Sequence, residues 1–131
     1  MTQREYLDEV PDDVTARLRG ICLALPDAHE QKAWVGTRWM VRTKTFAHLL
    51  GVAFDGGVPR VVLTFRSSGE ELEVLRRSGP PFHFLGWGRD AIGLEIDDRT
   101  DWSEVGELVI ESFCVMAPKK LVALIDRPPE P

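Results

Sequence analysis

The chain has 131 residues, of which 44% are hydrophobic and 28% charged, and its formal net charge is −5. These values are typical of one soluble globular domain that buries its own hydrophobic core. They exclude a strongly basic domain that wraps DNA, and no stretch approaches the roughly 20 apolar residues of a membrane span.

An amphipathic helix is the first predicted element, and it ends at Pro26. Asp12 and Asp13 stand where the N-cap and the first helical turn favour carboxylates. The apolar residues that follow recur at helical spacing, at Val14, Leu18, Ile21 and Leu25. This spacing predicts that one side of the helix packs on a core.

Four β-strands are predicted next, because the composition changes to short segments rich in Val, Thr, Phe and Trp. Gly36 and the turn signal Asp55-Gly56-Gly57 punctuate these segments. The predicted strands cover residues 30–35, 38–43, 46–54 and 60–66.

A second helix is predicted after the strands. Ser67 and Ser68 each precede a glutamate by three residues, as in a capping box, and Gly79 ends the helix. Residues 79–90 then form a loop with two prolines around Trp87.

A fifth strand and a last helix complete the predicted order. Residues 91–96 alternate between apolar and other side chains, as a half-buried strand does. Asp101 and Glu104 form another capping-box pattern, and the apolar stripe after them continues until Pro118.

This order, α-β-β-β-β-α-β-α, favours an α+β fold. Strands in consecutive hairpins, with helices grouped before and after them, predict a two-layer domain. An antiparallel five-stranded sheet would carry all helices on one face. We expect a single domain over residues 1–131, in which about ten N-terminal residues and the final PPEP are peripheral.

The N-terminus and the cysteines indicate a cytoplasmic protein. The first residues, MTQREYLDEVPDD, lack the basic start and apolar run of a signal peptide. Cys22 and Cys114 lie in apolar helical patterns without a partner at metal or redox spacing. We expect both thiols to be buried as small hydrophobic side chains.

Basic residues are concentrated between positions 31 and 66. This segment holds six basic residues and one acidic residue, a net charge of +5, while ten basic and twenty acidic residues lie elsewhere. A local cluster raises the potential even on a protein of opposite net charge, so the segment predicts a face that meets an anion. The six basic residues are Lys32, Arg38, Arg42, Lys44, Arg60 and Arg66.

Alternation along the strands assigns five of these cations to one face of the predicted sheet. Arg38, Arg42 and Lys44 share one side of the second strand. Arg60 and Arg66 share the corresponding side of the fourth strand, and apolar residues occupy the other side of both. We expect the helices to cover the apolar side and to leave the basic side uncovered or partly wet.

Two interpretations of this basic face stay open. In the first, the face binds an anion, and Trp34 and Trp87 stack on bases or cap a pocket. Trp87 stands between two glycines, so we expect it to be the most exposed tryptophan. In the second, the face is simply solvated, and cross-strand partners such as Glu95 neutralise its charge.

No catalytic or metal motif accompanies the basic segment. His29, His48 and His83 are 19 and 35 residues apart, and none stands at ligand spacing from a cysteine or a carboxylate. We therefore expect no metal ion or other cofactor. Lys44, flanked by two threonines, is the one cation predicted to lie close enough to the core to act as a base or an anion clamp.

Several stretches of the chain resemble the MmcQ/YjbR family of small bacterial proteins. They are ALPDAHEQKAW, RWMVRTKTFAHL, VVLTFRSSGEELEVL and WSEVGELVIESFCVMAPKKLVALI, and together they span roughly residues 14–125. The resemblance implies an antiparallel α+β fold similar to that of type III secretion chaperones, a cytoplasmic location and DNA binding without a catalytic mechanism. Family members commonly carry a glycine where Thr43 stands and a tyrosine where Phe113 stands.

The residues and the resemblance together predict a non-enzymatic, cytoplasmic binding protein that contacts the phosphate backbone of DNA or RNA, and no membrane. The predicted contacts are Arg38, Arg42, Lys44, Arg60, Arg66 and Trp87. The alternatives are a protein-interaction or chaperone-like module, which would form a homodimer or a complex with another chain, and a small-molecule binding protein. An enzymatic function would require Lys44 to be buried in a cleft.

Overall fold

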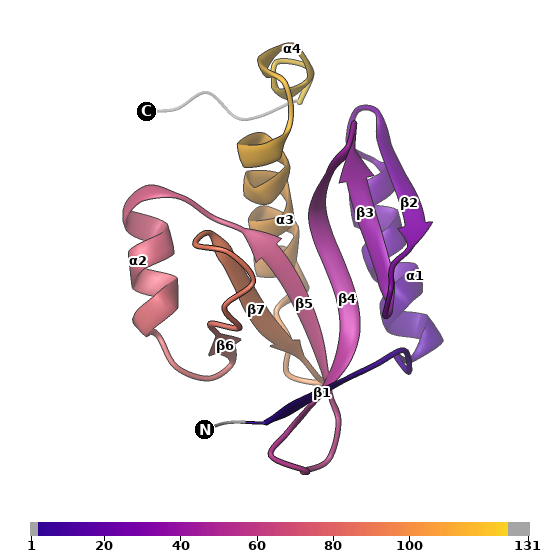
Figure 1. Cartoon of the computed structure of the whole chain (residues 1–131). Coiled ribbons are helices and arrows are strands. Elements are labelled where there is room, and N and C mark those ends of the chain that lie inside the picture. The colour runs from indigo at the N-terminus through magenta and orange to yellow at the C-terminus, as the bar shows by residue number, and fades with distance from the viewer. Residues whose placement is uncertain (1–2, 126–131) are drawn as a thin grey trace.

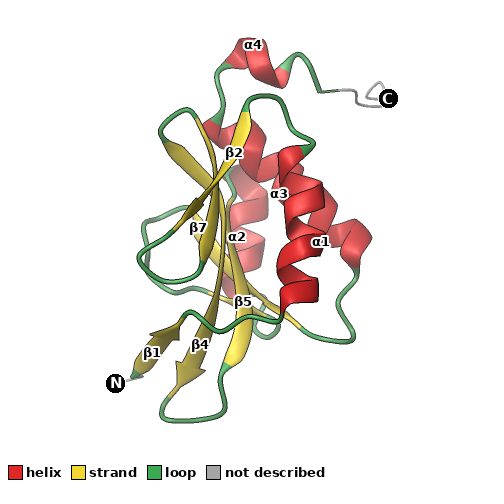
Figure 2. Cartoon of the chain, turned by 90° about the vertical axis from the view of Figure 1, so that its right-hand side faces the viewer, coloured by secondary structure: helices red, strands yellow, loops and turns green. Residues whose placement is uncertain are grey.

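In the computed structural model, residues 3–125 are described, and they form two layers. The strands are β1 (Arg4–Leu7), β2 (Ala28–Lys32), β3 (Thr37–Val41), β4 (Lys44–Phe54), β5 (Arg60–Arg66), β6 (Phe82–His83) and β7 (Ala91–Ile96). The helices are α1 (Asp12–Leu23), α2 (Gly69–Arg77), α3 (Trp102–Met116) and α4 (Lys119–Val122). Figure 2 shows the sheet on one side of the molecule and α1, α2 and α3 on the other, which confirms the predicted α+β class.

The sheet is antiparallel, and its strand order is β2-β3-β4-β5-β7-β6 (Figure 1). β1 pairs with Gly51–Phe54, the part of β4 that extends beyond β3. The described residues thus form seven strands, and the prediction of five was wrong. β1 and β6 have only four and two residues, too few for the alternation of apolar and polar side chains to indicate a strand.

Residues Arg4–Leu7 are therefore part of the sheet, whereas we expected about ten N-terminal residues to be peripheral. Tyr6 lies opposite Val52 in the pairing of β1 with β4. The predicted PPEP tail, in contrast, lies outside the described residues. None of the helices within residues 3–125 is both long and apolar enough to cross a membrane.

The main core fills the space between the sheet and the helices. Trp39, Phe46 and Phe65 project into it from the strands, and the rings of Phe46 and Phe113 meet edge to face with centroids 5.4 Å apart. Cys22 is fully buried here, and burial raises the pKa of its thiol, whereas Cys114 is only half-buried. The expected burial is thus confirmed for one of the two cysteines.

A β-bulge in β4 is the point at which helix α3 forms a hydrogen bond with the sheet. Trp39 pairs with Ala47 and Met40 pairs with Thr45, so Phe46 is an extra residue that has no partner in β3. The carbonyl of Phe46 accepts a hydrogen bond from the buried hydroxyl of Ser112 at 2.6 Å. A side chain of α3 thereby satisfies a backbone group that the bulge removes from the strand ladder.

The helix starts agree only partly with the capping prediction. The Asp101 carboxylate accepts hydrogen bonds from the N–H groups of Ser103 and Glu104 at the start of α3, as predicted. Ser68 occupies the N-cap of α2, but its side chain makes no capping hydrogen bond. Ser67 is buried, and its N–H donates to the carbonyl of Asp90.

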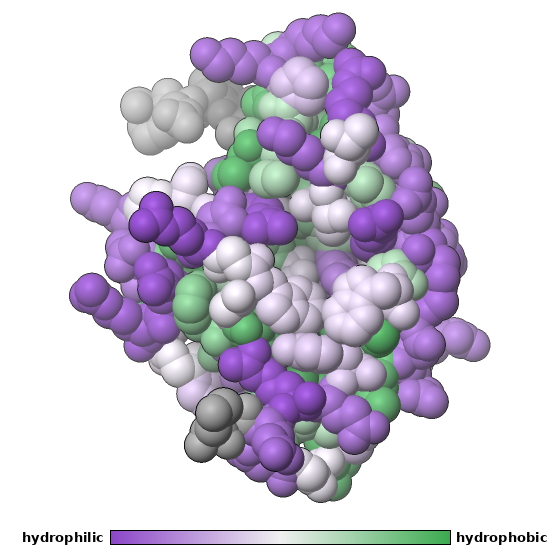
Figure 3. All heavy atoms as spheres, viewed as in Figure 1, coloured by the Kyte–Doolittle hydropathy of each residue, from purple (hydrophilic) through white to green (hydrophobic). Residues whose placement is uncertain are grey.

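A second, smaller apolar cluster lies on the opposite face of the sheet, which we call the open face. Its buried members are Leu50, Val52, Val62 and Leu85, and partly buried residues pack on it from β1 and from the loops before β3 and β7. In Figure 3, weakly polar and apolar side chains gather at the centre of this face, and hydrophilic ones surround them. The expectation of an uncovered basic face was therefore wrong for this central region.

Candidate functional site

The register of the sheet lines up one row of residues across the open face. Arg38 pairs with His48, His48 with Thr64, and Thr64 with Gly93. Arg66, two residues beyond Thr64 in β5, shares this face because side chains alternate along a strand. The structure thus confirms the predicted orientation of Arg38 and of the cations in β5.

Arg42 and Lys44 do not belong to that row. β3 ends at Val41, and Arg42 follows in the turn with a backbone φ of +56°. Lys44 pairs with Val41, a residue of the main core, and alternates with Thr45, which lines the open face. The predicted strand ran two residues too far because the sequence VRTK contains no Gly, Asn or Asp to mark the turn. Lys44 is exposed at this hairpin tip, so it does not lie near the core as predicted.

Most of the predicted cations are neutralised by carboxylates. Four of the six form ion pairs, all with acids outside the segment 31–66: Lys32 with Asp8, Arg42 with Asp27, Arg60 with Glu95 and Arg66 with Asp90. Within the part of the chain that is described, Arg38 and Lys44 form no ion pair. The local excess of positive charge in the sequence therefore does not produce a continuous basic surface.

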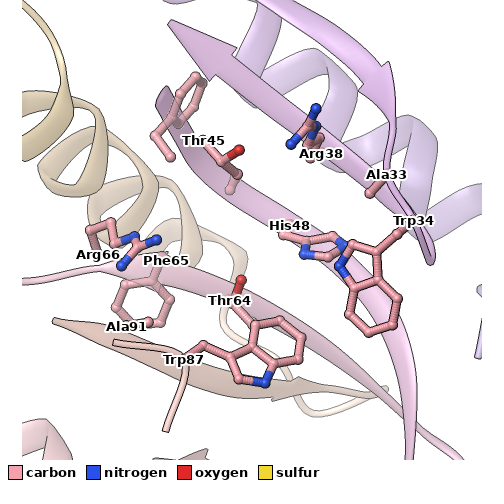
Figure 4. Close-up of a pocket in the computed structure, with 12 residues that line it drawn as sticks. Ala33, Trp34, Arg38, Thr45, His48, Thr64, Phe65, Arg66, Trp87 and Ala91 are labelled. Carbon is pink, nitrogen blue, oxygen red and sulfur yellow. The ribbon is translucent and has the colours of Figure 1, made fainter. Parts of the chain in front are cut away.

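A cavity of about 150 Å³ opens on this face between the two arginines. Figure 4 shows Arg38 and Arg66 on opposite sides, His48 between them, and the indole rings of Trp34 and Trp87 next to each other. Thr45 and Thr64 add hydroxyl groups to the wall. Of the six predicted contacts, Arg38, Arg66 and Trp87 come together here, whereas Arg42, Lys44 and Arg60 do not line the cavity.

Trp34 is the exposed tryptophan of the cavity, with 68% of its surface accessible. Trp87 is partly buried, and its Nε1–H donates to the Tyr6 hydroxyl at 3.2 Å. The Tyr6 ring meets both indoles edge on, at centroid distances of 5.6 Å for Trp34 and 5.2 Å for Trp87. The prediction that Trp87 is the most exposed tryptophan was therefore wrong, because β1 brings Tyr6 against it.

A tight loop between β2 and β3 holds Trp34 in place. Gly36 has a φ of +76°, and a Cβ built on it would lie 2.1 Å from the carbonyl oxygen of Leu49. The Gly36 N–H donates to the Asp8 carboxylate at 2.7 Å, and Lys32 donates to the same oxygen. Those two interactions hold the pKa of Asp8 below its ordinary value, Lys32 having the larger effect. The chain before α1 and the β2–β3 loop thus form one anchored support for the exposed indole.

His48 forms an uncharged floor for the cavity. Its ring is buried, and Nε2 lies 2.6 Å from the carbonyl of Val35. A carbonyl can only accept, so Nε2 carries the proton of the neutral ring. Burial lowers the pKa of His48, the charges of Arg38 and Lys32 lower it further, and the Val35 carbonyl acts in the opposite direction. Sequence reasoning missed Tyr6 and His48 as site residues because neither stands in a motif that indicates catalysis or ligand binding.

The pKa of His48 predicts a loss of stability in mild acid. The unfolded chain takes up a proton near the ordinary pKa of 6.5, but the folded imidazole does so only at a lower pH. The unfolded state therefore binds more protons just below pH 6.5, and the free energy of unfolding falls as the pH drops through this range. Urea unfolding at pH 7.5 and pH 5.5 measures the fall. His48→Gln should reduce the pH dependence, and an unchanged dependence would contradict this role of His48.

Of the two arginines that line the cavity, Arg38 is the one that forms no ion pair within residues 3–125. Its Nη2 donates to the Gln31 side chain at 2.9 Å, whereas its Nε is buried and has no hydrogen-bond partner in the described residues. Arg66 instead donates to Asp90 at 2.6 Å. The cavity therefore combines one uncompensated positive charge with aromatic walls and hydroxyl groups, an arrangement that suits a flat ligand with a negative charge.

Comparison with known proteins agrees with the fold. No curated protein matches the chain. The family model YjbR matches residues 23–115, a span that begins at the last residue of α1 and ends within α3. The span includes all residues that line the cavity, from Ala33 to Ala91. The chain therefore belongs to the YjbR family, as its sequence motifs led us to expect.

Proposed function

We propose that this protein is a non-enzymatic nucleic-acid-binding protein that uses the open face of its sheet. The observation that carries the proposal is the exposed indole of Trp34 at the mouth of a cavity whose Arg38 guanidinium has no carboxylate partner within residues 3–125. Indole rings stack on bases of any sequence, and an arginine without a carboxylate partner contacts phosphate.

A single strand fits this face better than a duplex does. The bases of a single strand are free to leave the stack and meet Trp34, whereas those of a duplex are paired and stacked. Lys44 is exposed at the tip of the β3–β4 hairpin and provides a further phosphate contact. Arg42, Arg60 and Arg66 contribute less, because Asp27, Glu95 and Asp90 already neutralise them. With a net charge of −5, the whole protein has low affinity for nucleic acid.

A salt titration tests this proposal. A labelled thymidine decamer should bind with a log–log salt slope of about −1.4 to −2.1, which corresponds to two or three phosphates on a single strand at roughly 0.7 each. Arg38→Gln should reduce the slope by about 0.7 and weaken binding about fivefold. Fluorescence anisotropy between 20 and about 200 mM salt measures both effects.

Arg99→Gln is the matched control, because it removes the same charge from an exposed loop between β7 and α3. It should leave both the slope and the affinity nearly unchanged. Equal effects of the two substitutions, or no binding of the decamer at low salt, would refute the proposed interface.

Protein interaction through β2 is a second candidate function. β2 is at one end of the strand order, and within residues 3–125 it pairs only with β3, which leaves an edge that a strand of another chain can join. Such a complex would not depend on the cations of the open face. The double change Arg42→Glu and Arg66→Glu should then leave association intact in size-exclusion chromatography, whereas nucleic-acid binding should be lost.

A catalytic function centred on Lys44 has no structural support, because this side chain is exposed at a hairpin tip. A catalytic lysine is usually desolvated in a pocket, where burial lowers its pKa. The proposed function is therefore one of binding alone.

A further inference from the structure

We propose that the cavity between Arg38 and Arg66 receives one unpaired pyrimidine base, with its phosphodiester bound by Arg38. This inference rests on the proposed function, and it adds the chemical unit that the open face recognises. The ligand is one nucleotide with a single-ring base, presented within a single strand.

The volume of the cavity sets the size of the base. About 150 Å³ is the volume of a site that accepts one benzene-sized ring. A pyrimidine has one six-membered ring, whereas a purine adds a fused second ring. The rings of Trp34 and Trp87 are 6.3 Å apart and inclined at 58°, so a base has no room to slide between them. The base must instead lie in the cavity itself, against the aromatic wall.

Three aromatic side chains from different parts of the chain build that wall: Trp34, His48 and Trp87. Trp87 lies 5.7 Å from the His48 ring and is held by the Tyr6 hydroxyl, so it is a rigid surface. Trp34 is mostly exposed, and the exposure of a large apolar ring to water costs free energy. A base that covers Trp34 removes this exposure and gains stacking energy at the same time.

Charge favours a phosphodiester over a free terminal phosphate. Arg66 is neutralised by Asp90, so Arg38 alone contributes an uncompensated charge of +1 to the cavity. An internal phosphodiester carries one negative charge and matches it, whereas the phosphate of a free nucleotide carries nearly two at pH 7. The guanidinium of Arg38, which forms no ion pair within the described residues, is the donor for such an oxygen.

Polar groups at the wall suit the edge of a base. Thr45 and Thr64 carry hydroxyls that both donate and accept, and they lie on neighbouring strands on the same face. His48 adds a neutral ring whose Nε2–H is already engaged with Val35. Neither the threonines nor His48 adds a charge, so the wall does not repel an uncharged base.

The test uses strands of ten nucleotides in which every position except the central one lacks its base. The central position carries thymine, adenine or no base. The strand with thymine should bind about tenfold more tightly than the strand without a base, since stacking of one base contributes a factor of this order. The adenine strand should bind several-fold less tightly than the thymine strand. Anisotropy at low salt measures all three affinities.

Substitutions at Trp34 complete the test. Trp34→Ala should remove the advantage of the thymine strand, and Trp34→Phe should retain part of it. Val58→Ala is the control, because Val58 is also a highly exposed apolar residue but lies in the β4–β5 loop, and it should change nothing. Trp34 is mostly exposed, so the variants are expected to fold.

The possible results separate this inference from the proposed function. Equal affinity for the thymine and abasic strands would overturn base recognition while leaving phosphate binding intact, and equal affinity for thymine and adenine would overturn the pyrimidine preference. Failure of every strand to bind would overturn both proposals. Thymidine monophosphate that binds as tightly as the thymine strand, with the same loss in Trp34→Ala, would support the cavity as a nucleotide site and overturn nucleic-acid binding.

Discussion

Replacing Gly36 with alanine is expected to lower the free energy of unfolding by about 3 kcal/mol, which corresponds to roughly 10 °C in melting temperature for a chain of this size. Two effects add. A φ of +76° is costly for any residue with a Cβ, and this Cβ would lie 2.1 Å from the Leu49 carbonyl oxygen, so the backbone must shift. Denaturant unfolding at neutral pH measures the change.

Gly56→Ala is the control for this substitution. Gly56 has nearly the same φ, +74°, but a Cβ built on it meets no other part of residues 3–125 within 4 Å, apart from its own chain neighbours. The Gly56→Ala substitution should lower the free energy of unfolding by only about 1 kcal/mol, because only the backbone conformation is unfavourable there. Equal losses at the two glycines would contradict the close approach of the Trp34 loop to β4. Because Gly36 positions this loop, its variant should also bind single strands less tightly than wild type.

Ser112→Ala is expected to lower the free energy of unfolding by about 2–4 kcal/mol. The Ser112 hydroxyl is fully buried, donates to the Phe46 carbonyl at 2.6 Å and accepts from the Arg66 N–H at 2.7 Å. Alanine leaves both backbone groups without a partner, and each lost hydrogen bond carries its own desolvation cost. Since the bulge at Phe46 and the end of β5 flank the cavity, the variant should also bind more weakly.

Ser78→Ala provides the comparison for Ser112→Ala. The Ser78 hydroxyl also bonds a backbone carbonyl, that of Val74 at 2.7 Å, but in an exposed position where water replaces it. The loss there should stay below about 0.5 kcal/mol. A similarly small loss in Ser112→Ala would show that the bulge does not depend on α3.

Much of the fold was predictable because the central strands follow simple alternation. Residues 60–66 and 91–96 are strands with the predicted bounds, and the apolar face of β5 packs on the main core. Periodicity predicts such strands well because each has one buried side. β1 and β6 form only because longer neighbouring strands offer them an unpaired edge. The periodicity of the sequence does not indicate such pairing.

The cluster of basic residues was predictable, but the ion pairs that neutralise most of it were not. The basic segment exists as expected, yet four of its six cations pair with acids that lie outside it, such as Asp8 and Asp90. Only the Glu95 partner was foreseen, from the alternation of the fifth strand. Ion pairs between distant positions depend on topology, so a count of charges along the chain overestimates the basic surface.

Only part of the candidate site was predictable, because three of the six predicted contacts line the cavity and the contributions of Tyr6 and His48 were missed. Arg38, Arg66 and Trp87 were predicted contacts and do line one cavity, whereas its support from Tyr6, His48 and Gly36 depends on three separate segments. No motif connects these segments in the sequence.

The most direct test of the open-face cavity as the binding site is NMR mapping. Spectra that correlate 1H with 15N are recorded while a thymidine decamer is added to the 15N-labelled protein. We predict that the largest shifts occur at the indole N–H groups of Trp34 and Trp87 and at the amides of Arg38, His48 and Thr64. Shifts centred on α1 and α3, or no shifts at low salt, would contradict this account.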